Sequence, residues 1–101
     1  MKRKPTEDEI WAIIGFIKIS QARFRTLQCL RHDNLMPSEI SRKTRLTPAQ
    51  VSVALHDMKK RKIVRCMNET VSKGRIYQCT DLGLEIIDML ENIGFNPDEQ
   101  D

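Results

Sequence analysis

The tetrapeptide Thr47-Pro48-Ala49-Gln50 is the feature that most restricts how this chain can fold. Threonine can accept a hydrogen bond at a helix start, proline suits the first helical position because no N–H is needed there, and glutamine at the third position can bond back to the cap. The tetrapeptide therefore predicts a helix that runs to about Arg61. Its apolar side chains recur at helical spacing and form an inner stripe of Val51, Ala54, Leu55 and Met58. The opposite face carries Ala49, Ser52, Val53, His56 and Lys60.

Helix starts of the same kind precede this segment. Residues 6–9 read Thr-Glu-Asp-Glu, a capping box that predicts a first helix to about Ile19. Ser20 can cap a second helix over residues 21–31. Pro37 suits the first position of a short helix to about Lys43, and residues 44–46 make a tight turn.

The second half of the chain predicts a hairpin and a last helix. Two β-rich runs, residues 63–67 and 75–80, are joined by a polar connection that ends in Gly74, which is typical of a hairpin with a long tip. Thr80 can cap a helix to about Ile93, and the polar end, residues 96–101, is expected to fray. The fold class is therefore mainly α with a small β-hairpin.

The length of 101 residues predicts one domain, residues 1–101, with a core over about 20–93. The longest apolar stretch, residues 10–19, contains Lys18 and is too short to span a bilayer, so we expect no membrane partner. Residues 1–9 are basic and then acidic and lack the apolar run of a signal peptide. We therefore expect a cytoplasmic protein.

Positive charge is concentrated in the middle of the chain. Residues 38–75 contain ten Lys or Arg and three acids, which gives +7, whereas the flanks sum to −4 and the whole chain to +3. Such segregation indicates a surface that binds a polyanion, with flanks that face something else.

The sequence resembles the winged helix-turn-helix transcriptional regulators in their small ArsR-like and MarR-like form, over about residues 20–93. Four segments carry the resemblance: 37–44 (PSEISRKT), 46–55 (LTPAQVSVAL), 59–64 (KKRKIV) and 74–83 (GRIYQCTDLG). Cys79 departs from the pattern, because the family usually has Leu before its Thr-x-x-Gly signature. This departure favours a core position for the thiol.

The resemblance implies that helix 47–61 enters the major groove of double-stranded DNA and that the wing, residues 68–75, lies on the backbone or in the minor groove. The residue chemistry agrees, because the outer face of the helix carries groups able to read base edges. Gln50 can pair with adenine and Val53 can contact a thymine methyl. The expected base-reading residues are Ala49, Gln50, Ser52, Val53 and His56. The expected phosphate-binding residues are Ser38, Arg42, Lys43, Arg45, Thr47, Lys59, Lys60, Lys73 and Arg75, and the neighbouring Arg61 and Lys62 belong to the same basic cluster.

The first and last helices, about 6–19 and 80–93, are apolar over more than one face and therefore require burial on two sides. In so small a domain, the second side is best covered by another copy of the chain. We therefore expect a homodimeric, sequence-specific DNA-binding regulator, with repression as the expected action. Its two basic heads would meet half-sites about one helical turn apart.

Other function classes find less support. No Gly-rich phosphate loop, HExxH or GxSxG motif is present, so we expect no enzyme activity and no cofactor. The three cysteines lack the close pairing of zinc sites, and a site from Cys29 and His32 would need ligands from elsewhere, so we expect no metal. Two alternatives stay open: an adaptor whose basic face binds an acidic protein of the transcription machinery, and a metal- or redox-responsive regulator. The sequence identifies no small-molecule effector.

Overall fold

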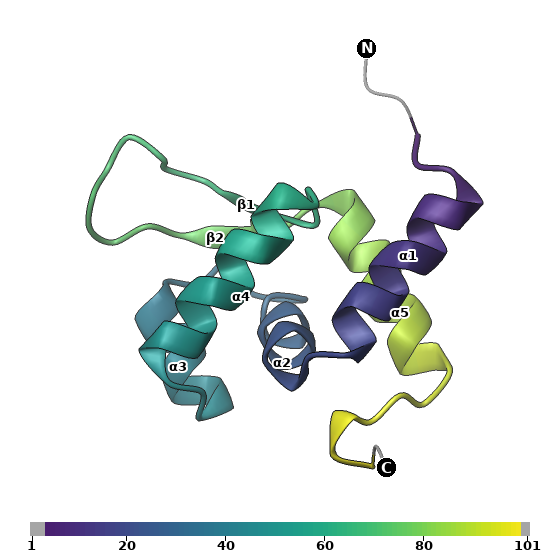
Figure 1. Cartoon of the computed structure of the whole chain (residues 1–101). Helices are drawn as coiled ribbons and strands as arrows, with labels where there is room; N and C mark the ends of the chain where they lie inside the picture. The colour runs from purple at the N-terminus through teal and green to yellow at the C-terminus, as the bar shows by residue number, and fades with distance from the viewer. Residues whose placement is uncertain (1–3, 100–101) are drawn as a thin grey trace.

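Five helices and one antiparallel hairpin follow one another in the order that the sequence predicts. A computed structural model describes residues 4–99 of the chain (Figure 1). The elements are α1 (Glu7–Lys18), α2 (Gln21–Cys29), α3 (Pro37–Thr44), α4 (Pro48–Lys60), β1 (Val64–Cys66), β2 (Tyr77–Cys79), α5 (Asp81–Asn92) and the 3-10 turn η1 (Pro97–Glu99). Within residues 4–99, no helix combines the length and the apolar character needed to cross a membrane.

The predicted capping boxes are confirmed at α1 and α4. At α4, the Gln50 backbone N–H donates to the Thr47 hydroxyl at 3.1 Å, and the Thr47 N–H donates to the Gln50 side-chain oxygen at 2.9 Å. At α1, Thr6 and Glu9 make the same reciprocal pair. Each box satisfies two backbone donors that the first helical turn would leave without partners.

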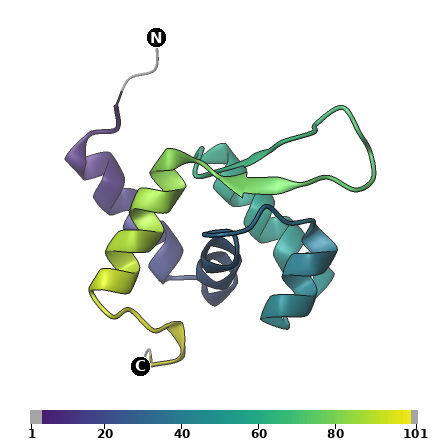
Figure 2. The ribbon, with the colours of Figure 1, turned by 180° about the vertical axis from the view of Figure 1, so that it is seen from behind.

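A single hydrophobic core joins all five helices and the hairpin. The inner stripe of α4 is 0–2% exposed, which confirms its predicted orientation. This stripe packs with α2 and α3 on one side of the molecule, while α1 and α5 lie side by side on the other (Figures 1 and 2). Helix α2 runs between the two groups, and the hairpin projects from the end of α4.

The hairpin is shorter than predicted, because pairing covers three residues in each strand instead of the expected runs 63–67 and 75–80. Val64 pairs with Cys79 and Cys66 with Tyr77. Beyond Met67 the side chain of Asn68 replaces the strand ladder: its oxygen accepts from the Ile76 N–H at 2.8 Å. A feature that the sequence did not predict lies at the other edge, where Leu35 and Tyr77 exchange two backbone hydrogen bonds of 3.1 and 2.8 Å.

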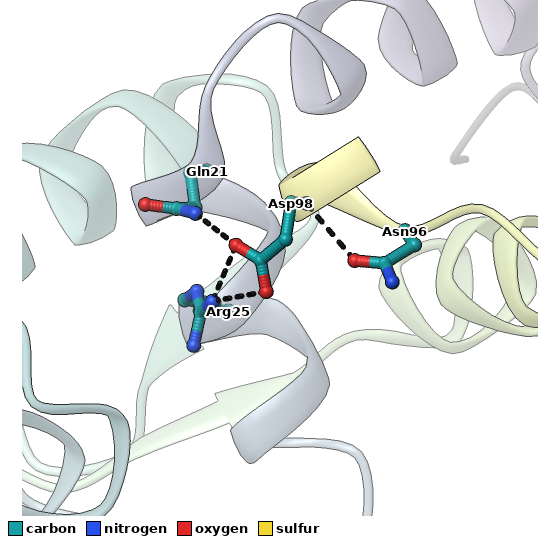
Figure 3. A network of polar contacts seen from close by, with 4 residues as sticks. All are labelled: Gln21, Arg25, Asn96 and Asp98. Carbon is teal, nitrogen blue, oxygen red and sulfur yellow. Dashed lines mark hydrogen bonds and ion pairs between the residues drawn. The ribbon is translucent and has the colours of Figure 1, made fainter. Parts of the chain in front are cut away.

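The polar end of the chain, which the sequence leads us to expect to be frayed, makes specific contacts over residues 96–99, and residues 100 and 101 lie outside the described residues. After α5 the chain turns back onto α2, and Phe95 meets Phe24 edge to face with ring centroids 5.0 Å apart. Both Asp98 carboxylate oxygens lie 2.8 Å from one Arg25 nitrogen, and the Gln21 amide donates to the same carboxylate (Figure 3). A paired carboxylate and a ring contact therefore hold a segment that composition alone marks as loose.

Gly83 allows α5 to start against the end of α4. The Thr80 hydroxyl accepts from the Gly83 N–H at 3.1 Å and donates to the Lys62 carbonyl at 2.8 Å. The Thr80 N–H in turn donates to the Ile63 carbonyl at 3.1 Å. A Cβ on Gly83 would lie 2.0 Å from that same Ile63 oxygen. The first turn of α5 therefore approaches the backbone more closely than any side chain permits.

We predict that Gly83→Ala destabilises the protein by about 3 kcal/mol or more, because the clash is with backbone that cannot move cheaply. Thermal unfolding followed by circular dichroism should show a Tm lower by roughly 10–20 °C. Gly74→Ala is the matched control, since a Cβ there meets open space and only the left-handed φ of 72° lowers stability, by about 1–2 kcal/mol. Equal stability of the Gly83 variant and the parent would contradict the close approach.

Candidate nucleic-acid interface

The outer face of α4 is open to solvent along its whole length. Within it, Val53 is 61% exposed although it is a large apolar side chain. The five residues that the sequence assigns to base reading are all exposed and lie on this face: Ala49, Gln50, Ser52, Val53 and His56. An open groove of about 330 Å³ separates the first half of α4 from the start of α2, with Ala22, Ala49 and Val53 among its lining residues. The face thus combines polar groups with an apolar strip.

Gln50 is only partly available to a ligand. Its side-chain oxygen accepts from the Thr47 N–H, and because a backbone N–H can only donate, the atom facing Thr47 must be the oxygen. Pairing with adenine through two bonds requires that oxygen as well as the amide nitrogen. In the capped conformation, one of the two lone pairs of this oxygen is occupied and the side chain is directed toward Thr47, so the paired contact with adenine requires the side chain to turn.

The turn between α3 and α4 is locked by two hydroxyls and presents a cation. The Ser41 hydroxyl donates to the Leu46 carbonyl at 2.6 Å, and the Thr44 hydroxyl donates to the Ile40 carbonyl at 2.6 Å. Arg45 sits at the turn with φ of 63°, a left-handed conformation that glycine adopts at lower cost. The predicted phosphate-binding residues of this region are all exposed: Ser38, Arg42, Lys43, Arg45 and Thr47.

The four cations at the end of α4 divide among different roles. Lys59 is ion-paired with Glu69 of the wing, and the hydrogen bond between them raises the pKa of Lys59 and lowers that of Glu69. The Arg61 guanidinium lies over the Phe16 ring, 4.5 Å from its centroid, and so points toward α1. Lys60 is exposed, and Lys62 holds a left-handed φ of 62° where it ends the helix.

The wing is shaped by its own polar side chains. The Asn68 amide donates to the Gly74 carbonyl at 3.1 Å. Arg75, expected to bind phosphate, is half-buried and donates to the carbonyls of Val71 at 2.8 Å and Glu69 at 3.3 Å. These bonds use two of its five N–H groups and leave the others for a ligand. The sequence missed the role of Asn68, although an asparagine that opens a loop closed by glycine is a usual turn signal.

Positive charge without an acidic partner is concentrated in one region of the described chain, although single cations such as Lys4 and Lys18 lie outside it. Among residues 4–99, five predicted phosphate-binding cations have no acidic partner: Arg42, Lys43, Arg45, Lys60 and Lys73. Cations of α2 and its C-terminal turn are neutralised instead, since Arg25 pairs with Asp98 and Arg31 pairs with Asp88 and Glu91. The unpaired cations come from α3, its turn, the end of α4 and the wing. Helix α3 and the wing lie on the side away from α1 and α5, whereas the end of α4 lies close to the start of α5 (Figure 1). We call this surface the basic face.

A cluster around Phe16 fixes α4 relative to α1, and no pattern in the sequence indicated it. The Arg23 guanidinium lies 3.9 Å from the Phe16 ring centroid and donates to the Phe16 carbonyl at 3.0 Å. It also forms a 3.3 Å ion pair with Asp57 on α4. Together with Arg61, this cluster joins three helices through one aromatic ring.

The cysteines lie in apolar surroundings. Cys66 and Cys79 are buried, as expected for small core side chains, and Cys29 is half-buried. Burial raises the pKa of Cys79 to about 12, and burial also raises the pKa of Cys29. Within residues 4–99, no three His, Cys, Asp or Glu side chains gather into a cluster able to hold a metal ion.

Known proteins with a similar sequence were not found: no family model and no curated protein matches the chain. Solved structures with the same fold are numerous. TubR of Bacillus thuringiensis serovar israelensis, bound to 24 bp of tubC, superposes with a TM-score of 0.73 at 15% identity and covers 91% of this chain and 99% of its own.

Two further structures extend the comparison. MepR of S. aureus in its DNA complex has a TM-score of 0.67 at 16% identity, covering 87% of this chain and 74% of its own. The homodimeric winged helix-turn-helix domain Mb0332 of Mycobacterium bovis, a possible ArsR-family regulator, has a TM-score of 0.67 at 14% identity and covers 93% and 90%. The chain therefore has the winged helix-turn-helix fold, which confirms the fold class inferred from sequence.

We predict that Cys79 resists alkylation in the native protein. With a pKa of about 12, only about 1 in 10,000 of its thiols is ionised at pH 8, and the thiolate is the reactive form. Iodoacetamide at pH 8 followed by peptide mass analysis should leave Cys79 unmodified, while all three cysteines react in denaturant, which serves as the control. Rapid native labelling of Cys79 would contradict its packing and would revive a thiol-based switch.

Proposed function

We propose that this chain is a sequence-specific double-stranded DNA-binding transcriptional regulator that acts as a homodimeric repressor. Helix α4 lies in the major groove, and the wing touches the backbone or the minor groove. The observation that carries the proposal is the basic face, where cations without acidic partners surround the exposed side of α4. The DNA-bound structures of TubR and MepR, which share the fold, support the same assignment.

The chemistry of the basic face suits a duplex. Helix α3 packs beside α4 and the wing projects from the end of α4 (Figure 1), so cations of both elements can reach the phosphate backbones that border a groove. The same charge that attracts DNA gives an affinity that falls steeply with salt, because each phosphate contact releases counterions. We assign no catalytic activity and no cofactor to this surface, and we place the protein in the cytoplasm, where such a regulator meets its DNA.

Two of the basic positions carry a conformational cost that glycine would avoid. Arg45 and Lys62 both have φ near +62°, at the two ends of the unit formed by the turn and α4. A side chain in this region costs about 1–2 kcal/mol relative to a relaxed backbone. The free energy gained when these side chains contact phosphate would offset the conformational strain.

We predict that Arg45→Gly and Lys62→Gly each stabilise the protein by about 1 kcal/mol yet weaken its binding to every duplex tested. Duplex binding is measured by fluorescence anisotropy across a salt series. The slope of the logarithm of the binding constant against the logarithm of the salt concentration should be shallower for each variant than for the parent, by about one for each phosphate interaction removed. Lys4→Ala, which removes a charge outside the basic face, is the control and should leave the slope unchanged. The proposal fails if the parent protein binds no duplex at low salt.

The same titration separates the proposal from an interaction adaptor. An adaptor would use the basic face to bind an acidic protein and would show no duplex affinity. A DNA reader binds duplex more weakly when the outer face of α4 changes, and the size of that effect depends on the DNA sequence.

The dimer interface is assigned to α1 and α5. Trp11 on α1 is 57% exposed, Ile19 directly after α1 is 78% exposed, and Ile93 directly after α5 is 66% exposed. Trp11, Gly15 and Ile19 are spaced by four residues and share one side of the helix, where the glycine permits close approach of a second helix. The homodimeric state of Mb0332, which shares the fold, supports this arrangement. Two protomers then present two copies of α4 to neighbouring half-sites, and the bound dimer represses by covering the promoter.

We predict that Trp11→Glu yields a monomer, because it places a charge in an apolar interface. Sedimentation velocity should show a mass of about 12 kDa for the variant and about 24 kDa for the parent. Met67→Glu, which alters an exposed apolar residue directly before the wing, is the matched control and should remain dimeric. A monomeric parent, or a dimeric Trp11 variant, would place the interface elsewhere.

A further inference from the structure

On the face of α4 that would meet the bases, Gln50 already makes a hydrogen bond within the protein. The Gln50 side-chain oxygen accepts from the Thr47 N–H at 2.9 Å, which occupies one of its two lone pairs and directs the side chain toward the helix start. A bond that caps the helix is broken if the oxygen turns to a base, which weakens the helix start. The paired contact that makes glutamine selective for adenine is therefore disfavoured here.

The apolar part of the same face is unusually open. Val53 is 61% exposed, and Ala49 lies one turn before it on the same face and is also exposed. Both line the groove toward Ala22 on α2, so the apolar strip continues beyond α4. Asp57 also lines the groove, but its carboxylate is paired with Arg23. Among the described residues that line this groove, no unpaired acid is present to repel a phosphate.

The major groove offers one apolar group that fits such a strip. Thymine carries a C5-methyl at the groove edge, and cytosine and uracil carry only hydrogen at that position. A methyl group that packs on a branched side chain removes apolar surface of both partners from water. Arg42, Lys43, Arg45 and Lys60 belong to the same basic face and would hold the backbone while the strip meets the bases.

We propose that the chain reads thymine methyl groups through Val53, with Ala49 beside it, and that Gln50 serves chiefly as the helix cap. This inference rests on the proposed DNA-binding function and names the chemical group by which the bases are distinguished. Each half-site then contains at least one thymine whose methyl packs against Val53.

The experiment begins with selection of a bound duplex from a random library. Each thymine of that duplex is then replaced singly by deoxyuridine, which removes the methyl and leaves base pairing unchanged. We expect one or two positions in each half-site where the affinity of the parent falls about three- to fourfold, the value of one buried methyl or methylene group. The remaining thymines should tolerate the change.

Val53→Ala provides the second arm of the test. The residue is exposed and alanine favours helix, so the variant should fold. It should bind the thymine duplex more weakly than the parent does, and deoxyuridine at the critical position should weaken its binding little further. Such non-additivity is the signature of a direct contact. Lys60→Ala is the control, because its effect should simply add to that of deoxyuridine.

The outcomes separate the inference from the function on which it rests. Absence of duplex binding by the parent overturns both. Binding that is insensitive to deoxyuridine at every position overturns methyl reading and leaves the DNA-binding function standing. Equal sensitivity in the parent and in Val53→Ala also overturns it, because the methyl would then touch another residue.

Discussion

Burial of one stripe of α4 is the constraint on which the rest of the structure depends. Val51, Ala54, Leu55 and Met58 are almost completely removed from water, and no other rotation of this helix would bury four apolar side chains at once. Fixing the rotation also fixes what faces outward. The polar and apolar groups proposed to meet the bases are therefore placed by the core itself, which is why a helix with modest intrinsic stability can present a defined surface.

Backbone contacts then relate the wing and α5 to this helix. The Thr80 hydroxyl bridges the Lys62 carbonyl and the first turn of α5, and the glycine at position 83 lets the two segments meet. On the outer side, Lys59 pairs with Glu69 of the wing. The contacts of Thr80 and Gly83 are made to backbone atoms, which cannot shift without a large cost in free energy. The ion pair between Lys59 and Glu69 is exposed, contributes little to stability, and can be replaced by salt ions or by a phosphate. The base of the wing is thus held more firmly than its tip.

Signals within a few residues of one another allowed most of the fold to be predicted. The caps at Thr6, Ser20, Thr47 and Thr80 place four helix starts, and all four side chains accept the expected hydrogen bond. Contacts between distant residues escaped prediction, because nothing in the local pattern specifies them: Arg23 meets Asp57 across 34 positions, and Arg25 meets Asp98 across 73. The same limit applies to the candidate site. Charge and periodicity identified the basic face, but the engagement of Gln50 in its cap and the turning of Arg61 toward α1 depend on conformation.

The contact of Arg61 with the Phe16 ring affects the geometry of the proposed dimer. Arg23 and Arg61 both lie against one ring of α1, and Arg23 also pairs with α4. The helix proposed to form the dimer and the helix proposed to enter the groove are therefore in direct contact. A dimer built on α1 and α5 would therefore hold its two copies of α4 at a separation set by packing instead of by a flexible linker. Half-sites one helical turn apart, about 34–36 Å, require a fixed separation of this kind, because a reader that slips by one base pair no longer matches either half-site. Under the proposed function, Arg61 would act by holding α4 in place, because its guanidinium lies over the Phe16 ring of α1.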